Sequence, residues 1–224
     1  MTDEQQTPAP EVPLPQKSEP ILNLPPATRA LVLANLAVFL AEILLPEKTS
    51  DRLVTFFGFV PARYTGHAHA GLAALVSPVT HMFLHGGWLH IGVNVTALMA
   101  FGAGVEKVMG AKRMLLFYFL TGLAGALLHA LVYPASTIPM IGASGAISGL
   151  FGGVLIMMAD AGLMGGGKAR VKTLLPVIAL WLAAAVFFGY FGMPGVNSPI
   201  AWTAHVGGFI AGLLLFKPCL RLVI

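Results

Sequence analysis

Six long runs of apolar residues divide the chain, and each is about as long as a helix that crosses a membrane. Such a helix needs about 20 mostly apolar residues, with a range of about 17 to 25. The runs contain glycines and lack the strict alternation of barrel strands, so the pattern favours helices. It predicts an all-α polytopic membrane protein, a six-transmembrane-helix bundle. The predicted spans are residues 29–45, 86–105, 113–132, 143–162, 171–190 and 201–217.

The composition agrees with a lipid environment. Hydrophobic residues make up 57% of the 224 residues and charged residues only 10%, and the mean hydropathy is +0.82. A soluble domain carries roughly 25% charged residues, so the sequence indicates an integral membrane protein. Cys219 is the single cysteine, which excludes an internal disulfide and argues against a cysteine metal cluster.

The segments outside the spans are polar or short. Residues 1–28 are rich in proline and bury too little apolar area to fold alone, so we expect a disordered cytoplasmic tail. They lack the pattern of a cleaved signal peptide, and the first span is expected to act as an uncleaved signal anchor. Residues 29–217 form the predicted transmembrane domain, and residues 218–224 a short cytoplasmic C-terminal tail.

The distribution of Lys and Arg predicts the orientation. Ten of the 13 lie in the tails or in the loops after the second and fourth spans, and three lie on the other side. Because cytoplasmic segments are enriched in Lys and Arg, both termini are expected in the cytoplasm. The net charge of +4 reflects this topology and attraction to anionic lipid; no nucleic-acid partner is indicated. The bacterial inner (plasma) membrane is the expected location.

Four polar residues of three spans share one layer of the predicted membrane. His90 and Asn94 lie in the second span, Ser144 begins the fourth, and His205 begins the sixth. All three spans enter from the non-cytoplasmic side, so these side chains lie within roughly 10 Å of that face at 1.5 Å per residue. A lone membrane serine usually bonds its own helix, and a lone histidine can simply link helices. Their common depth favours a functional site open to the non-cytoplasmic side.

Glycines predict that the fourth and sixth spans pack closely. Gly145 and Gly149 are four residues apart, and so are Gly208 and Gly212 on the face of His205. This spacing lets two membrane helices approach closely, which would bring the Ser144 hydroxyl within reach of the His205 ring. For the glycines alone, ordinary helix packing without chemistry is the favoured explanation.

Three motifs resemble those of one known family. "GASGAISG" around Ser144, "AHVGGFIAG" around His205 and "HMFLHGGWLHIGVN" ending at Asn94 are similar to the motifs of rhomboid intramembrane serine proteases. "GVEKVMG", with Glu106 and Gly110, resembles the family's pattern after the second helix. The resemblance covers about residues 29 to 217, with the motifs in the family's order.

The resemblance implies a serine endopeptidase with a Ser-His dyad and no cofactor or metal. Ser144 would be the nucleophile and His205 the general base, while His90 and Asn94, with the Ser144 backbone N–H, would stabilise the oxyanion. Substrates would be transmembrane segments of other membrane proteins, cut near their non-cytoplasmic end. The oligomeric state is not predicted. The residues expected to give structural support are His85, Gly142, Gly145, Gly149, Gly208, Gly212 and Glu106; His81 is read in the same way.

The sequence also departs from the family. Many rhomboids carry an aromatic residue four positions after the nucleophile, stacked on the base, and here that residue is Ser148. Either Phe151 or a neighbouring span then supports the His205 ring, or the ring is less well held. The loop of about residues 46 to 85 lacks a Trp-Arg pair found in many members, although Arg63 could serve a related role. His67 and His69 of this loop are expected to be solvent-exposed. The fifth span is the candidate gate for substrate.

Three other classes of protein compete with this interpretation. A haem- or metal-binding membrane protein could use several histidines, and His81 and His85 have ligand-like spacing, but Ser144 and Asn94 would then have no role. A transporter would place its polar residues near the midplane with repeat symmetry, which we do not find. A catalytically inactive rhomboid-like binder is disfavoured because both Ser144 and His205 are present.

Overall fold

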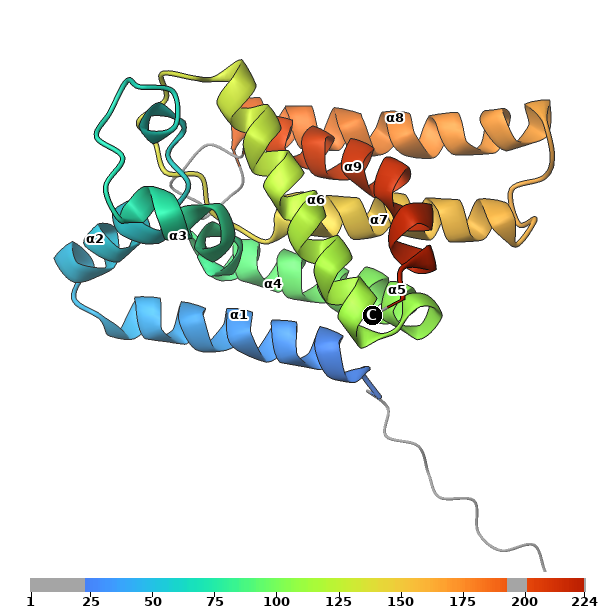
Figure 1. Ribbon diagram of the computed structural model, residues 1–224, viewed down its shortest axis with the longest axis horizontal. Coiled ribbons are helices and arrows are strands. Elements are labelled where there is room, and N and C mark those ends of the chain that lie inside the picture. Colours follow the sequence, from blue (N-terminus) through green and yellow to red (C-terminus); the bar gives the residue numbers. More distant parts are fainter. Residues whose placement is uncertain (1–22, 193–200, 224) are drawn as a thin grey trace, which may run out of the picture.

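The computed structural model describes residues 23–192 and 201–223, without the side chains of residues 168–171. Helices dominate this part of the chain (Figure 1). The long helices are α1 (Pro26–Leu44), α6 (Ala111–Val132), α7 (Ser144–Asp160), α8 (Lys168–Phe191) and α9 (Trp202–Arg221). The shorter elements are α2 (Glu47–Phe57), η1 (Pro61–Arg63), α3 (Ala73–Thr80), η2 (His81–Phe83), α4 (Trp88–Ala97), η3 (Leu98–Gly102) and α5 (Ala103–Met109).

The all-α polytopic bundle predicted from the sequence is confirmed. In the described ranges, five helical segments are long and apolar enough to cross a membrane: Pro26–Leu44, Trp88–Met109, Ala111–Val132, Lys172–Phe191 and Trp202–Arg221. The predicted fourth span corresponds to α7, which is apolar but has only 17 residues. The second span is built from α4, η3 and α5, and η3 is a π-helical turn that the sequence pattern did not indicate.

Helices α1 and α9 each extend a few residues into the predicted tails. Helix α1 begins at Pro26, because proline suits the first turn and Glu106 accepts hydrogen bonds from the backbone N–H groups of Ala27 and Thr28. Residues 26–28 are therefore helical. At the other end α9 continues through Pro218 to Arg221, because Cys219 is buried in the core. Residues 1–22 of the predicted N-terminal tail lie outside the described residues.

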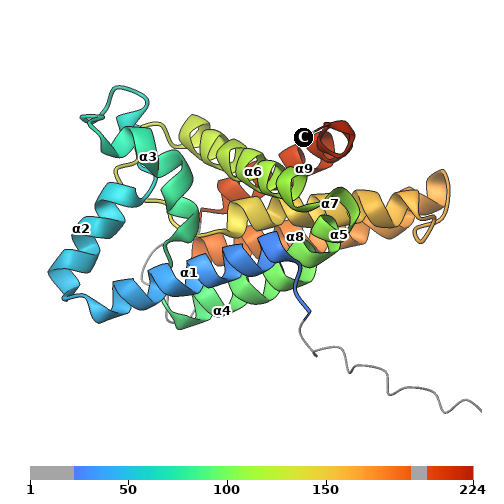
Figure 2. The same cartoon turned by 60° about the horizontal axis from the view of Figure 1, so that its bottom comes forward.

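The helices alternate in direction along the bundle. Helices α1, α6 and α8 run one way, and α4–α5, α7 and α9 run the other way (Figures 1 and 2). The start of α1 and the end of α9 therefore lie at one end of the molecule, here called the terminal end. The opposite end carries α2, α3 and the starts of α4, α7 and α9, and is called the site end.

Helices α6, α7 and α9 pack very closely through glycines. A Cβ atom on Gly208 of α9 would clash with the carbonyl oxygen of Gly145 on α7, and one on Gly212 would clash with that of Gly149. A Cβ atom on Gly149 would in turn overlap the side chain of Thr121 on α6. The backbones of α7 and α9 therefore touch along two helical turns, which fixes where side chains at their first turns meet.

Helix α8 is far less buried than its neighbours. Within an apolar stretch of 18 residues, only 6% of α8 is buried, compared with 50% of α9. It contacts the bundle through Leu174, Ile178 and Trp181, which pack on a cluster that includes Leu155 of α7 and Phe209 of α9. Most of α8 thus presents its side chains outward.

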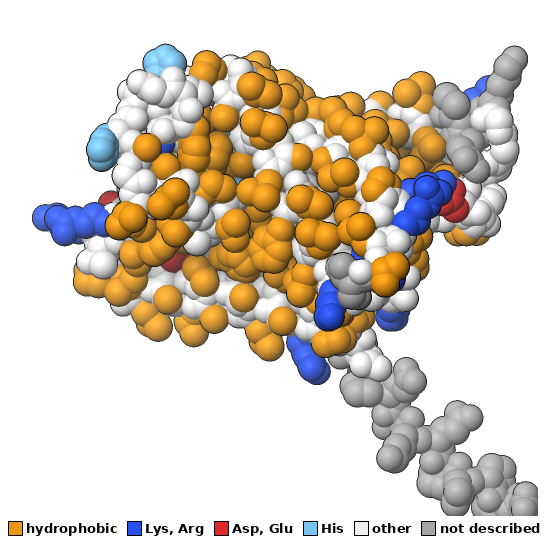
Figure 3. Space-filling model, viewed as in Figure 1, with side chains coloured by type: hydrophobic (Ala, Val, Ile, Leu, Met, Phe, Trp, Pro, Cys, Tyr) orange, Lys and Arg blue, Asp and Glu red, His pale blue; other side chains and the backbone are white. Residues whose placement is uncertain are grey.

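The surface has the character expected of a protein in lipid. Figure 3 shows a broad field of hydrophobic side chains over the middle of the molecule, with most of the visible Lys and Arg side chains toward the terminal end. Helix α1 contributes Leu33, Leu36, Leu40 and Ile43, each more than 40% exposed. These side chains form an apolar outer face along that helix.

Candidate active site

Ser144 and His205 meet at the site end of the bundle. The Ser144 Oγ atom lies 2.7 Å from the Nε2 atom of His205, within hydrogen-bonding distance. Ser144 is the first residue of α7 and His205 lies in the first turn of α9, so the contact depends on the glycine packing of these two helices. Both residues are half-buried, which leaves the pair partly accessible.

The start of α7 offers free backbone donors beside this pair. Within α7 the first N–H group to reach a helix carbonyl is that of Ile147, which bonds the carbonyl oxygen of Ala143 at 3.0 Å. The N–H groups of Ser144, Gly145 and Ala146 therefore have no acceptor within the helix, and the positive end of the helix dipole lies at the same place. The environment of the Ser144 hydroxyl favours negative charge.

His90 points toward the same place from α4. A Cβ atom on Gly142 would lie 2.7 Å from the Nε2 atom of His90 and 3.7 Å from Ser144 Oγ. The two side chains therefore both lie close to Gly142. Gly142 has a φ of +114°, a conformation that L side chains rarely adopt, and its N–H bonds the His81 carbonyl oxygen at 2.8 Å. A larger residue here would displace the His90 ring.

Asn94 lies one turn along α4 from His90, on the same helix face. It is only 5% exposed, and its Nδ2 atom has no hydrogen-bond partner among the described residues. A buried amide donor without an acceptor is costly, and such groups in native proteins usually have a role. Asn94 is thus a donor that is available to a ligand.

One aromatic residue, Trp181 of α8, lies beside the His205 ring and belongs to a larger aromatic cluster. The Trp181 ring lies 6.5 Å from the His205 ring between centroids, and Trp181 stacks on Phe209 of α9 at 4.7 Å. Phe151 joins this cluster at 6.1 Å from Trp181. Ser148, at the position where an aromatic was expected, instead donates a hydrogen bond to the Ser144 carbonyl oxygen at 2.7 Å.

The other predicted residues lie around this centre or away from it. His81 bonds the Ser77 carbonyl oxygen through Nδ1, and His85 stands edge-on to His90 at 5.0 Å. Glu106 caps the start of α1 at the terminal end, far along the bundle from Ser144. Arg63 has a buried Nη1 atom without a partner in the described part of the chain. His67 and His69 are exposed.

Two residues near this centre were not predicted. Trp181 could not be singled out, because the rotation of α8 about its own axis is set by packing against α9. Glu42 of α1 is only 7% exposed and accepts a hydrogen bond from the His85 N–H at 3.2 Å. A carboxyl group inside an apolar span is a usable sequence signal, since ionisable residues are rare there.

The described residues contain no group of three or more His, Cys, Asp or Glu side chains placed to hold a metal ion. The expectation that the protein uses no metal or cofactor stays a prediction.

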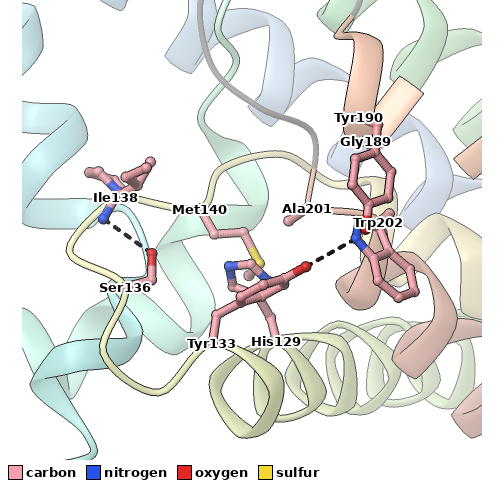
Figure 4. A pocket seen from close by; sticks show the side chains of 10 residues that line it. His129, Tyr133, Ser136, Ile138, Met140, Gly189, Tyr190, Ala201 and Trp202 are labelled. Atoms are coloured by element: carbon pink, nitrogen blue, oxygen red, sulfur yellow. Dashed lines mark hydrogen bonds between the residues drawn. The ribbon is translucent and has the colours of Figure 1, made fainter. Parts of the chain in front are cut away.

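A pocket of about 250 Å³ lies at the site end, where α6 and α8 end and α9 begins. Figure 4 shows Tyr133 and Trp202 side by side in its lining, with the Trp202 indole N–H donating to the Tyr133 hydroxyl at 3.3 Å. Met140, two residues before Gly142, lines its inner wall. The pocket combines aromatic walls with polar groups from His129 and Ser136.

Comparisons with known proteins agree with this architecture. A family model described as the Rhomboid domain matches residues 73–221. The chain is 30% identical over 210 residues to RHOMBOID-like protein 1 of Arabidopsis thaliana, which covers 83% of this chain and 51% of that protein. It is 34% identical to Rhomboid-type serine protease 2 of Emericella nidulans, covering 60% of this chain and 25% of the other. For Rhomboid-like protease 5 of Toxoplasma gondii the identity is 31%, with coverages of 63% and 16%.

Fold and site together define a helical integral membrane protein in which a serine and a histidine from two glycine-packed helices are in contact. The chain belongs to the rhomboid family, whose model matches residues 73–221. It spans about half or less of the length of the three relatives named above. Two of these relatives are named as proteases.

Proposed function

We propose that the protein is an intramembrane serine endopeptidase with Ser144 as nucleophile and His205 as general base. The observation that carries the proposal is the 2.7 Å contact between Ser144 Oγ and His205 Nε2. A serine hydroxyl attacks a carbonyl efficiently only when a base within hydrogen-bond reach takes its proton. Family membership and the protease names of two relatives support the same reaction class.

The chemistry follows from the positions of these groups. As Ser144 Oγ bonds to the scissile carbonyl carbon, its proton moves to His205 Nε2. His205 then gives that proton to the leaving amine, and the C–N bond breaks to leave an acyl-enzyme ester. Water, with its proton taken by His205, hydrolyses the ester and restores the serine. The Trp181 ring, which stacks on Phe209, lies beside the imidazole and holds it in place of a carboxylate partner.

The negative charge that develops on the carbonyl oxygen has candidate donors nearby. The Ser144 N–H lies at the start of α7, and His90 Nε2 borders Gly142. Asn94 Nδ2 is a buried donor with no partner in the described ranges. Removal of one donor of this kind typically costs about 10² to 10³ in rate.

We further propose that substrates are transmembrane segments of other membrane proteins, entering past α8. The low burial of α8 supports this route, because moving this helix disrupts few contacts. The excess of Lys and Arg in the tails and two loops supports cytoplasmic termini and a site that opens to the opposite face, as in a bacterial inner membrane. Under this orientation, cleavage falls near the non-cytoplasmic end of the substrate.

Cleavage of a reporter transmembrane protein in proteoliposomes tests the proposal. Wild type, Ser144→Ala and His205→Ala are compared at equal amounts of folded protein, with unfolding midpoints measured for each. Both variants should lose cleavage, because the nucleophile or its base is absent, while their unfolding midpoints stay close to that of wild type.

Two results would overturn the proposal. Undiminished cleavage by Ser144→Ala or His205→Ala would mean that the activity does not use this pair. No cleavage by the folded wild type, across several transmembrane reporters that it binds, would instead favour the inactive rhomboid-like binder.

A further inference from the structure

A buried carboxyl group that the catalytic scheme does not use lies at the site end of α1. Glu42 Oε2 accepts a hydrogen bond from the backbone N–H of His85 at 3.2 Å. Phe39, three residues earlier, meets Trp88 edge-on with ring centroids 5.0 Å apart, and Trp88 is the first residue of α4. Helix α1 therefore holds the segment that leads into α4 through one polar and one aromatic contact.

Packing alone does not explain a carboxyl group at this position. Glu42 is 7% exposed, and its Oε1 atom has no hydrogen-bond partner among the described residues. An ionisable group inside an apolar helix is costly, and an apolar side chain of similar size would fill the space at lower cost. What the carboxyl group does hold is the turn of residues 85–87.

This turn contacts the His90 ring and determines which of its two nitrogens carries the proton. The backbone N–H of Gly86 donates a hydrogen bond to His90 Nδ1 at 3.3 Å, and the His85 ring stands edge-on to His90. A ring nitrogen that accepts a hydrogen bond carries no proton, so a neutral His90 holds its proton on Nε2. Nε2 is the atom that borders Gly142 beside Ser144.

We propose that Glu42 is a positioning residue for the oxyanion site: it anchors the turn of residues 85–87, so that the Gly86 N–H keeps the His90 proton on Nε2, facing Ser144. The inference rests on the proposed protease function. Without the anchor, the turn can shift, Gly86 no longer fixes Nδ1, and His90 spends part of its time with an unprotonated Nε2 that cannot donate to the oxyanion.

Two substitutions separate the hydrogen bond from the volume of the side chain. Glu42→Gln keeps an oxygen that can accept from the His85 N–H, and Glu42→Met keeps a similar length but has only a weakly accepting sulfur. We expect Glu42→Met to lower kcat about tenfold or more, below the 10² to 10³ loss for removing a donor outright, with KM nearly unchanged. The kcat of Glu42→Gln should stay within about threefold of wild type, because Gln can still accept the His85 hydrogen bond. A threefold change in kcat corresponds to well under 1 kcal/mol.

Glu106 provides the matched control. Its buried carboxyl group also accepts hydrogen bonds from backbone N–H groups, but those of the start of α1, at the terminal end. Glu106→Gln should lower the unfolding midpoint while kcat per folded molecule stays the same. If Glu42→Met does not fold, Glu42→Ala takes its place in the same comparison.

A double-mutant cycle with His90→Ala distinguishes positioning from general destabilisation. If Glu42 acts through His90, Glu42→Met lowers kcat in the wild type but causes no further loss in the His90→Ala background. Equal fractional losses in both backgrounds, or a Glu42→Gln variant as impaired as Glu42→Met, would overturn the inference. The proposed function is judged separately: it fails if cleavage persists in Ser144→Ala, whatever the Glu42 variants do.

Discussion

Two regions of the bundle differ sharply in how tightly they are packed. In the trio of α6, α7 and α9, glycines let backbones touch, and Leu150 of α7 is fully buried. In α8, only 6% of an 18-residue apolar stretch is buried, and Leu180 is 73% exposed. The closely packed trio carries Ser144 and His205, while α8 contributes the Trp181 ring beside His205.

The difference assigns two roles: the closely packed helices position Ser144 and His205, and the loosely held α8 lets substrate enter. A contact of 2.7 Å between side chains on two helices requires that neither helix can slide or rotate, which the backbone contacts at Gly208 and Gly212 provide. A polypeptide substrate, in contrast, must enter from the side of the bundle, and a loosely held helix permits this at small cost. The predictions below test this division, from the largest expected effect to the smallest.

Gly208→Val should have the largest effect. Its Cβ atom would clash with the carbonyl oxygen of Gly145, and a backbone atom cannot move aside as a side chain can. The loss of unfolding free energy should exceed the about 1–3 kcal/mol of ordinary overpacking, and cleavage should be lost. Gly104→Ala on α5, where a Cβ atom meets nothing within 4 Å, is the control and should leave both unchanged.

A pair of identical substitutions compares the two regions directly. Leu150→Ala on α7 should cost about 2–5 kcal/mol of unfolding free energy, because it leaves a cavity in the core. Leu180→Ala on α8 should change it by no more than about 0.5 kcal/mol, because that side chain faces outward. Denaturation in one detergent measures both, and similar losses would contradict the proposed looseness of α8.

Trp181→Ala tests the contact between α8 and the His205 ring, and its expected effect is smaller than those of Gly208→Val and Leu150→Ala. Removing the ring 6.5 Å from that of His205 should lower kcat about tenfold, a cost of about 1.4 kcal/mol, through a less well-held base. Phe187→Ala is the control, since the Phe187 ring contacts the rings of Phe188 and Phe191, which lie on α8 itself. Full activity of Trp181→Ala would mean that α8 has no part in holding His205.

The sequence sufficed for the bundle and for the pair of residues at its centre, for identifiable reasons. Apolar runs of helical length predict the spans, and four-residue glycine spacing predicts which spans touch, so the approach of Ser144 to His205 could be inferred. Trp181 could not, because no local pattern states how α8 is rotated. The contact of Glu106 with the start of α1 joins residues 78 and 79 positions apart, a distance that periodicity cannot bridge.

Helix ends were also beyond the sequence pattern. Pro218 reads locally as a stop, yet burial of Cys219 carries α9 to Arg221. The π-helical turn η3 likewise depends on packing, since its Gly102 lies against Leu98, Met114 and Thr28. Local preferences of this size are overridden when a few side chains gain burial.

The most direct test of the central claim is labelling of the folded protein by a fluorophosphonate, which reacts with an activated serine. The account predicts that wild type is labelled and that mass spectrometry places the adduct on Ser144. Labelling should disappear in Ser144→Ala and fall strongly in His205→Ala, because without the imidazole the hydroxyl keeps its proton. Equal labelling of wild type and His205→Ala, or an adduct on another serine, would contradict the account.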